Sequence, residues 1–408
     1  MNKVYYFLAL LFSVYLVPSL GALDKANTQW LYLCIVLVIF ARSIKHIRIK
    51  KDGILILYLF FLAQVVLSIT YTKNISISIV DISRHLTTGI ILLLFLHLLK
   101  RQKISFLAIS YIISAVLIYE SILALKPLLY YIKDNGLNFT NVNYVDIDHF
   151  KGIAGNRNIT TASIVIKIPF LIYSIVNMKK YISYLTSLLL TFPVLVLLII
   201  NSRAALLSFI IIVILFNVFT LLDKNKNLVK VINVNLIMVL SFLGSNLILP
   251  DEGRNTMKQI ASIEISNESS SNRFFLWENA LDYIYKNPII GSGIGNWKVE
   301  SAAYWSSYGN SYLVPFHAHN DFLEFATEIG IMGGITYLVL FIITQLKLAI
   351  LYLKSKKSKL LIVSLSFLAL FIDSLLNFPF ERPVIQVMFM VLLALTIHYT
   401  EENNEERI

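Results

Sequence analysis

Two histidines and an aspartate stand at alternate positions in the segment Phe316-His317-Ala318-His319-Asn320-Asp321. On an extended backbone, alternate residues share one side, so His317, His319 and Asp321 could together bind a metal ion. The same histidines could instead cap and hydrogen-bond the beginning of a following helix. In a third reading one histidine is a catalytic base, because a neutral imidazole can accept the proton of an acceptor hydroxyl near pH 7. The metal reading is the weakest, because no second histidine or cysteine cluster completes the ligand set.

Ionisable residues also occur within or beside the long apolar runs of the chain, where charge is costly and usually functional. Most of them lie toward the same end of their runs, which predicts a polar cavity that opens on one side of a membrane. Each residue alone could equally be a paired or snorkelling side chain near an interface. Arginine binds phosphate through two parallel hydrogen bonds, so such a cavity would suit a lipid-linked diphosphate. The residues are Asp81, Arg84, His85, Lys167, Arg203, Glu324, Glu328, Asp373, Glu381 and Arg382.

A glycine-rich segment, Gly291-Ser292-Gly293-Ile294-Gly295-Asn296-Trp297, precedes the histidines. The backbone N–H groups of such a segment can cradle a phosphate. No clear strand leads into this segment and no clear helix follows it, so the pattern does not indicate a dinucleotide-binding fingerprint. We expect a flexible turn here.

The elements that must position these residues are membrane-spanning helices. Hydrophobic residues make up 57% of the chain and charged residues 14%, against about 45–50% and about 25% in soluble domains. Many apolar runs approach the roughly 20 residues that one span requires. We predict an all-α integral membrane protein with about twelve transmembrane helices, at about 4–20, 29–44, 53–71, 77–99, 104–126, 159–177, 182–200, 204–222, 231–249, 322–346, 360–377 and 384–399.

The charges of the loops predict the orientation of these helices. Lysine and arginine concentrate in alternate loops, for example at 42–51, 100–103 and 354–359. Such loops stay in the cytoplasm, so both termini are predicted to be cytoplasmic, including the tail at 400–408. These loops also account for the net charge of +11, which therefore does not indicate nucleic-acid binding. A single cysteine, Cys34, excludes an intrachain disulfide and a cysteine-built metal site.

Two long segments then fall on the outer face, at about 127–158 and about 250–320. They divide the chain into nine helices within 1–249, a large periplasmic loop with short helices at 250–320, and three helices within 321–399. In the second segment Ser271 or Asn272 could cap a helix that ends before Pro288. Its apolar residues recur at helical spacing, which favours a surface helix packed on the membrane domain, with a lid over a lipid-linked substrate as the alternative. These residues are Phe274, Trp277, Leu281 and Ile284.

Over roughly Gly152 to Leu395, the sequence resembles the O-antigen ligase and polymerase superfamily, and the lipopolysaccharide O-antigen ligases most. One matching feature is an arginine with a leucine four positions on, in Asn201-Ser202-Arg203-Ala204-Ala205-Leu206-Leu207. The other is His319-Asn320, followed at the family's spacing by Gly330 and Gly334. Further local likenesses are Gly155-Asn156-Arg157-Asn158, the helix that begins at Arg273, and Asn377-Phe378-Pro379-Phe380-Glu381-Arg382-Pro383.

The resemblance implies an inverting glycosyltransferase that uses no metal ion, nucleotide or other cofactor. Its donor would be a glycan on undecaprenyl diphosphate, and its acceptor a hydroxyl of the lipid A-core on the periplasmic face of the bacterial inner membrane. By the resemblance, His319 would be the base that activates the acceptor, and His317 would assist it. Arg203 and Arg273 would hold the diphosphate and stabilise charge on the leaving group. The wider substrate-binding set that we predict adds Arg84, Arg157, Asn320, Glu324 and Arg382.

Other activities share these features. A polymerase would join repeat units on the same lipid carrier, and a protein O-oligosaccharyltransferase would use serine or threonine as its acceptor. The chain ends soon after the last predicted span, which favours a ligase over a protein transferase. A flippase could use the same cavity, but transporters often contain paired repeats and broken midplane helices, and neither is visible in the sequence. The expected partners are the lipid-linked glycan, the acceptor and membrane lipids, without nucleic acid.

Overall fold

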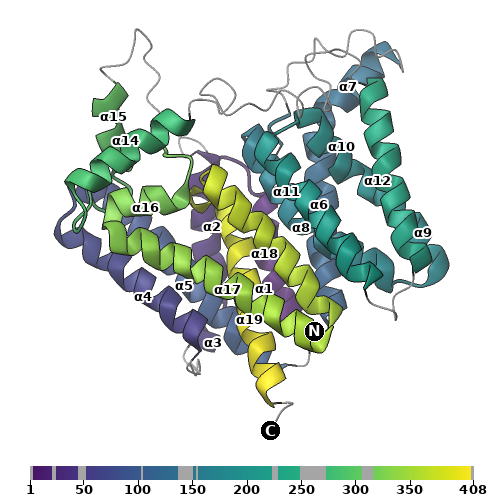
Figure 1. Cartoon of the computed structure of the whole chain (residues 1–408), viewed down its shortest axis with the longest axis horizontal. Helices are drawn as coiled ribbons and strands as arrows, with labels where there is room; N and C mark the ends of the chain where they lie inside the picture. The colour runs from purple at the N-terminus through teal and green to yellow at the C-terminus, as the bar shows by residue number, and fades with distance from the viewer. Residues whose placement is uncertain are drawn as a thin grey trace. The chain divides into compact units, whose positions relative to one another are not determined.

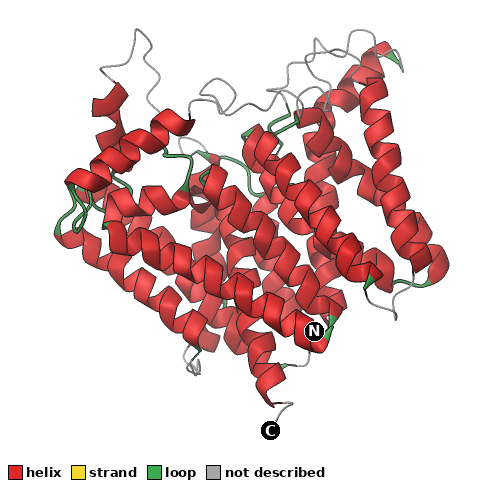
Figure 2. Cartoon of the chain, in the orientation of Figure 1, coloured by secondary structure: helices red, strands yellow, loops and turns green. Residues whose placement is uncertain are grey.

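The computed structural model describes residues 3–20, 24–44, 52–102, 104–136, 150–152, 155–222, 228–248, 273–305 and 316–405. Within these ranges Figure 2 shows helices joined by loops, with no strand. Ten of the described helices are long and apolar enough to cross a membrane, as in a multi-pass membrane protein. The prediction of an all-α membrane protein is therefore confirmed for the described residues.

The chain divides into two compact units, each assembled from separate stretches of sequence. Unit 1 comprises Met1–Gln29, Gln102–Ile263 and Leu348–Leu370, and unit 2 comprises Trp30–Arg101, Glu264–Lys347 and Phe371–Ile408. Figure 1 labels their helices. Unit 1 holds α1 (Lys3–Phe12), η1 (Ser13–Leu16), α6 (Phe106–Ala124), α7 (Lys126–Asn135), α8 (Arg157–Asn177), α9 (Lys180–Ser187), η5 (Leu188–Leu190), α10 (Thr191–Ile200), α11 (Arg203–Leu221) and α12 (Leu228–Ile248).

Unit 2 holds the helices on which the histidines and most of the predicted cavity residues lie. Three further helices, α2 (Lys25–Ile39), α17 (Ile331–Ser355) and α18 (Ser358–Leu376), contribute residues to both units. The helices of unit 2 alone are α3 (Ala41–Ile44), α4 (Gly53–Leu67), η2 (Ser68–Thr70), α5 (Ile75–Arg101), α14 (Arg273–Lys286), α15 (Trp297–Trp305), α16 (Asp321–Ile329), η6 (Pro379–Glu381) and α19 (Pro383–Glu405).

The number of twelve spans is not confirmed. The first two predicted spans correspond to shorter apolar helices, at Lys3–Leu16 and Lys25–Ile39. The first outer segment, predicted at 127–158, contains most of α7. Parts of the predicted outer segments and of the tail lie outside the described ranges. These parts are residues 137–149 and 153–154 of the first outer segment, residues 249–272 and 306–315 of the second, and residues 406–408 of the tail. The helix α19 continues into the predicted tail, as far as Glu405.

The tenth predicted span, 322–346, is wrong in its position. The chain breaks at Gly330, which has a φ of 82° and separates the nine-residue helix α16 from the spanning helix α17. A Cβ at Gly330 would lie 2.3 Å from the carbonyl oxygen of Ile289, so a glycine is required here both by the backbone angle and by the space. Glu324 and Glu328 consequently lie on a short separate helix rather than within a span.

In unit 1 the predicted cavity residue Lys167 lies in the core. Its ammonium nitrogen is 2.8 Å from Oε2 of Glu120, and the exposed fractions of the two side chains are 1% and 0%. The hydroxyls of Tyr15 and Ser163 accept hydrogen bonds from the same ammonium group. Lys167 therefore forms a buried ion pair that joins α8 to α6. The expectation that this lysine lines an open cavity is wrong.

Removing one member of this pair should destabilise the protein strongly. Lys167→Met leaves the Glu120 carboxylate buried without its cation, which typically costs about 3–5 kcal/mol. The double variant Glu120→Gln/Lys167→Met should recover most of that stability, because neither charge remains. Thermal unfolding of the detergent-purified variants measures both effects, and a single variant as stable as the wild type would contradict a structural role for the pair.

The helix predicted before Pro288 is confirmed as α14, which ends at Lys286. The residues proposed to cap it, Ser271 and Asn272, lie outside the described ranges. The face that packs differs in part from the predicted one, because Ile284 is buried as predicted but Phe274 and Leu281 are exposed. Ala280 and Tyr283 are buried instead, in a cluster with Trp297 and Ala318, and this cluster ties α14 to the histidine segment.

Candidate active site

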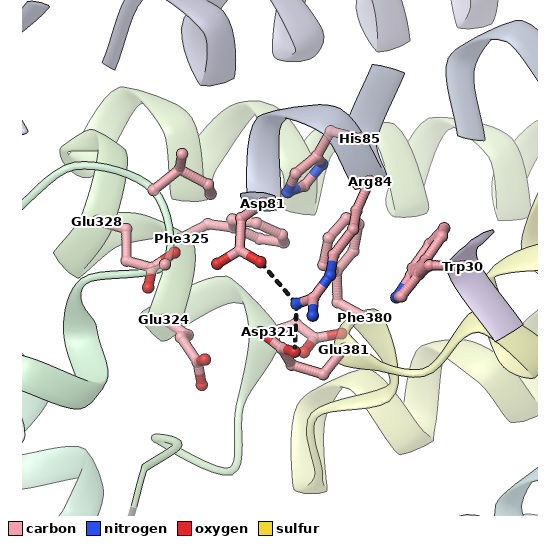
Figure 3. A pocket seen from close by; sticks show the side chains of 12 residues that line it. Trp30, Asp81, Arg84, His85, Asp321, Glu324, Phe325, Glu328, Phe380 and Glu381 are labelled. Carbon is pink, nitrogen blue, oxygen red and sulfur yellow. Dashed lines mark hydrogen bonds and ion pairs between the residues drawn. The ribbon is translucent and has the colours of Figure 1, made fainter. Parts of the chain in front are cut away.

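A cavity of about 410 Å³, a volume that includes its opening to solvent, lies within unit 2. Figure 3 shows side chains from α2, α5, α16 and the segment around η6 converging on it. The sequence predicted a polar cavity from the ionisable residues of separate spans, and the structure brings six of these residues together. They are Asp81, Arg84, His85, Glu324, Glu328 and Glu381, and the other lining residues are Trp30, Ile294, Gly295, Asp321, Phe325 and Phe380.

The cavity is acidic. Its lining contains five carboxyl groups, one arginine, Arg84, and the histidine His85. Burial raises the pKa of Asp321 and Glu328 well above the usual range, which favours the protonated form of these two groups.

Nη1 of Arg84 lies 2.7 Å from Oδ1 of Asp81 and 3.3 Å from Oε2 of Glu381, so two of the carboxylates share this cation. From the sequence we predicted a cavity that binds an anion, because arginine can bind phosphate. The sequence does not reveal that Arg84 contacts the carboxylate of a residue 297 positions away.

Aromatic rings form the apolar part of the cavity wall. The ring of His85 stacks on Phe380, with centroids 4.2 Å apart, and packs at an angle against Phe325, at 5.8 Å. Trp30 also lines the cavity and was not predicted, because a tryptophan in an apolar run carries no signal that separates a binding site from ordinary packing.

The glycine-rich segment at 291–297 is a packed strap that contains the expected turn, at 294–295. The expectation that no helix follows the segment is wrong, because α15 begins at its last residue, Trp297. Residues 291–297 are buried. Ser292 and Gly293 donate their backbone N–H groups to the carbonyls of Thr327 and Glu328, at 3.0 and 2.8 Å. The next backbone groups are used in the same way: the N–H of Ile294 bonds to Ser68, and that of Trp297 to the Glu328 carboxylate. These internal bonds occupy the groups that a phosphate cradle would need.

The strap also joins α5 to the cavity. The side-chain amide of Asn296 donates to the hydroxyls of Thr72 and Ser78, at 2.8 and 2.9 Å. A Cβ at Gly295 would lie 1.9 Å from Oδ2 of Asp81, so the absence of a side chain lets this carboxylate reach the cavity wall. Gly295 also has a φ of 76°, which favours glycine.

Glu324 holds the histidine segment in place. One of its oxygens lies 2.8 Å from Nδ1 of His317, and the other accepts the backbone N–H of Ala318 at 2.9 Å. The His317 ring also stacks on Phe378, with centroids 4.2 Å apart. Asn320, rather than a histidine, caps α16, because its Oδ1 accepts the N–H of Leu323 at 3.1 Å. Its amide nitrogen donates to the carbonyl of Leu375, so both ends of this predicted substrate-binding side chain have structural partners.

His319 is held in a strained position with a free ring atom. Its φ of 53° lies in the left-handed region, which a non-glycine residue adopts at a cost. Its ring meets Phe378 edge to face at 4.9 Å. Nδ1 is buried and has no hydrogen-bond partner among the described residues. Such an arrangement is typical of a side chain that is kept for chemistry rather than for packing.

The two histidines differ in basicity. Burial lowers the pKa of His319 to about 4, helped by the positive charges of Arg273 and His317, so its imidazole is neutral at pH 7. Burial would also lower the pKa of His317, but the Glu324 carboxylate and its hydrogen bond outweigh that effect and raise the pKa above its usual value. The pair therefore combines a neutral imidazole with a neighbour that holds its proton.

Arginines surround the histidines. Arg273 begins α14, and its Nη2 donates to Oδ1 of Asn377 at 3.1 Å. Asp373, which does not line the cavity, accepts a hydrogen bond from the amide of Asn377 and so supports this arrangement. The guanidinium carbon of Arg382 lies over the ring of Phe378, 5.4 Å from its centroid. Phe378 is thus a common packing surface for Arg382, His317 and His319.

The remaining predicted residues, Arg203 and Arg157, lie in unit 1. Arg203 is the first residue of α11 and follows Asn201, whose φ of 58° is left-handed. Nη1 of Arg203 is buried and has no hydrogen-bond partner among the described residues. Arg157 is the first residue of α8, after the capping residue Asn156. A cation at the beginning of a helix opposes the helix dipole, and both positions therefore suit an anionic ligand.

The structure also changes which residues could bind a metal. The predicted ligand set of His317, His319 and Asp321 is not the one whose ligand atoms lie close together. Among the described residues, His317, Glu324 and Glu381 place one ligand atom each within 4.8 Å of one another. In this structure Nδ1 of His317 is instead engaged with Glu324 in an ion-pair geometry.

Comparison with protein families adds an independent observation. Residues 186–338 match the family model described as O-antigen ligase. Over this stretch the chain is therefore similar to that family. Members of this family are glycosyltransferase-like enzymes that act as ligases or polymerases. No curated protein matches the chain.

The matched stretch is narrower than the resemblance noted in the sequence, but it contains the residues to which catalysis was assigned. Arg203, Arg273, His317 and His319 all lie within residues 186–338. Arg84, Arg157 and Arg382 lie outside them. The roles assigned to these residues stay predictions.

Chemical modification should distinguish the two histidines by pH. Diethyl pyrocarbonate reacts with neutral imidazole, so His319 should stay fully reactive from pH 8 down to pH 5 and lose reactivity only near its pKa of about 4. His317 should lose reactivity at a higher pH, because its raised pKa keeps it protonated. Fragmentation mass spectrometry of the modified peptide locates each adduct. In Arg273→Gln the midpoint for His319 should move upward, because a cation that disfavours protonation is removed.

A midpoint for His319 near 6.5, the value of an unperturbed imidazole, would contradict the electrostatic account. An unchanged midpoint in Arg273→Gln would show that Arg273 does not act on this histidine.

Proposed function

We propose that the protein is an inverting glycosyltransferase that moves a glycan from undecaprenyl diphosphate to an acceptor hydroxyl, as in O-antigen ligation to the lipid A-core. The observation that carries the proposal is His319, a neutral imidazole with an unpartnered ring nitrogen beside cationic arginine, within the stretch that matches the family. We further propose that the protein resides in the bacterial inner membrane, with both termini in the cytoplasm and the active site on the periplasmic face.

The proposed reaction needs one base and a set of cations. The acceptor hydroxyl gives its proton to His319 while its oxygen attacks the anomeric carbon of the donor sugar. The bond from that carbon to the diphosphate oxygen breaks, and the configuration at the carbon inverts. Negative charge gathers on the departing undecaprenyl diphosphate, where Arg273 and Arg382 would stabilise it. The resemblance assigns the same role to Arg203. No metal ion or nucleotide enters this scheme.

The remaining residues take positioning roles in this proposal. Glu324 holds His317 and the backbone at Ala318, which sets the direction of the histidine segment. The Glu324 carboxylate raises the pKa of His317 and so favours its protonated, positively charged form beside His319. That charge, together with Arg273, keeps His319 neutral and ready to accept a proton.

A polymerase is the second candidate, because the matched family includes both ligases and polymerases. It would use the same base and the same donor, and its acceptor would be a repeat unit on a second lipid carrier. A protein O-oligosaccharyltransferase differs from both in its acceptor, a serine or threonine hydroxyl.

Substitution of the proposed base and of one proposed cation tests the chemistry. His319→Ala should reduce glycan transfer by at least about 100-fold, since general base catalysis contributes about 10²–10⁴-fold. Arg203→Ala should cost about 10²–10³-fold, the usual loss when one stabilising group is removed from a developing charge. His398→Ala and Arg101→Ala serve as matched controls with near wild-type transfer. Activity is measured on purified, membrane-reconstituted protein with lipid-linked glycan, and full activity of either site variant would refute its role.

Deletion of the gene distinguishes the candidate reactions. For a ligase, we expect the lipid A-linked polymer to disappear while carrier-linked polymer accumulates, because donor is made but not transferred. A single repeat unit left on the core would indicate a polymerase. Unglycosylated proteins beside normal lipopolysaccharide would indicate a protein transferase. Gel electrophoresis of lipopolysaccharide and mass spectrometry of carrier-linked glycans measure these outcomes, and an unchanged surface glycan would contradict all three.

A further inference from the structure

Large apolar side chains are exposed at the end of α14 and in the segment that follows it. The exposed fractions of Tyr285, Ile289 and Ile290 are 86%, 82% and 54%. Tyr285 lies in the last turn of α14, and the two isoleucines directly precede the buried strap at 291–297. Single exposed apolar residues are ordinary, but a cluster of them indicates an interaction surface. We call residues 285–290 the apolar tip.

Backbone contacts fix the apolar tip at the beginning of the spanning helix α17. The carbonyl of Pro288 accepts the N–H of Ile331, the first residue of α17, at 2.9 Å. The carbonyl of Ile289 lies so close to Gly330 that a Cβ there would be 2.3 Å from its oxygen. The apolar tip therefore lies at the level at which this spanning helix begins.

The strap holds the apolar tip to two further spans of unit 2. The carbonyl of Ser292 accepts the N–H of Lys73, two residues before α5 begins, at 3.1 Å. The N–H of Ile294 donates to the hydroxyl of Ser68, near the end of the span Gly53–Thr70, at 3.2 Å. In Figure 1 the segment between α14 and α16 lies beside one end of α4. Three spans therefore begin or end beside the strap and the apolar tip.

The exposed side of α17 continues the surface of the apolar tip. Its exposed apolar residues recur at helical spacing along one side of the helix, and in a spanning helix such a side faces lipid. Within unit 2 these residues are Ile331, Met332, Ile335, Ile342, Ile343 and Leu346. Because Ile331 is bonded to Pro288, the lipid-facing side of α17 begins directly beside the apolar tip.

We propose that the apolar tip inserts into the edge of the bilayer beside α17, so that its partner is the lipid at the membrane surface. Tyrosine is enriched at this depth, because its ring is apolar and its hydroxyl can reach water. Burial of the two isoleucines in lipid is favourable, as for any apolar surface that leaves water. Lys286 also fits this depth, because 62% of its side chain is exposed and a lysine at an interface can extend its ammonium group to water.

Insertion of the apolar tip would hold α14 along the membrane surface. The other end of α14 is also attached at the end of a span, because Arg273 donates to Asn377, the residue after α18. Figure 1 shows α14 running across the beginning of α17 rather than in line with it. The diphosphate of a lipid carrier lies at the same depth, since its tail is in the bilayer. The apolar tip would thus keep Arg273 where the donor carries its charge, a consequence that rests on the proposed function.

Depth-dependent fluorescence quenching tests the insertion without turnover. Cys34→Ser removes the single native thiol. In that background Ile289→Cys carries a nitrobenzoxadiazole dye, and the full-length protein is reconstituted into phosphatidylcholine vesicles. Nitroxides near the top of the lipid acyl chains should quench the dye, and aqueous iodide should not.

The matched control is Val299→Cys with the same dye. Val299 is also apolar and 45% exposed, but it lies on α15, which Figure 1 shows farther from α17 than α14. Iodide should quench the dye there, and the lipid nitroxides should not. Equal lipid quenching at the two positions would show that the dye itself enters the bilayer and would overturn the proposal.

A charge variant tests whether apolar burial drives the insertion. With the dye on Ile290→Cys, Ile289→Glu should lower the ratio of inserted to exposed dye by about ten-fold, the change expected when one buried isoleucine becomes charged. Val299→Glu should leave that ratio unchanged. Unchanged lipid quenching in Ile289→Glu would overturn the proposal. A dye on Ile289→Cys that is shielded from both quenchers would assign the surface to another protein segment or a second copy of the chain, and would overturn it as well.

A kinetic measurement tests the consequence for the donor. Ile289→Glu should raise KM for the lipid-linked donor several-fold and change kcat little, because Arg273 is no longer held at the membrane surface. Lost insertion with an unchanged KM would overturn this consequence. Lipid quenching of the apolar tip in a protein that transfers no glycan would keep the insertion and refute the proposed function. Active transfer by a protein whose apolar tip is not quenched by lipid would do the reverse.

Discussion

A charge that leaves water needs a partner of opposite charge, and this constraint arranges both units of the protein. In unit 1 the constraint joins Lys167 to Glu120 in a fully buried pair. In unit 2 it joins Arg84 to Asp81 and Glu381, and it joins His317 to Glu324. Two of these contacts join segments that are far apart in the sequence, Lys167 with Glu120 and Arg84 with Glu381, and they therefore help to determine which segments pack together. The other two, Arg84 with Asp81 and His317 with Glu324, are local and position side chains within one segment.

Some buried polar atoms have no hydrogen-bond partner among the described residues, and two of them belong to predicted site residues. They are Nη1 of Arg203, in unit 1, and Nδ1 of His319, in unit 2. Other such atoms lie outside the predicted site, so a missing partner alone does not identify a binding site. At Arg203 and His319 the missing partner coincides with the motifs that the sequence singled out, and a folded chain tolerates such atoms where a ligand completes them.

Backbone geometry also positions the site residues of unit 2. The strap at 291–297 uses its N–H groups internally, so it braces α16 and α5 rather than binding phosphate. The absence of a side chain at Gly295 lets Asp81 approach the strap. Gly330 separates α16 from the span that follows, which releases Glu324 from the spanning helix and lets it hold the histidine segment. The local chemistry of His319 thus depends on a glycine eleven positions away.

Composition, apolar run length and motif spacing by themselves determined that the protein is an all-α membrane protein, that a helix ends before Pro288, and that the motifs at Arg203 and His319 resemble those of the O-antigen ligases. These properties are local, because an apolar run or a short motif can be interpreted from neighbouring residues alone. Only the tertiary structure decided that Lys167 pairs with Glu120, that Arg84 is shared by two carboxylates, and that the cavity is acidic. The physical reason is that the pairing of a charge depends on which helices meet, and the partner of Arg84 lies 297 positions away.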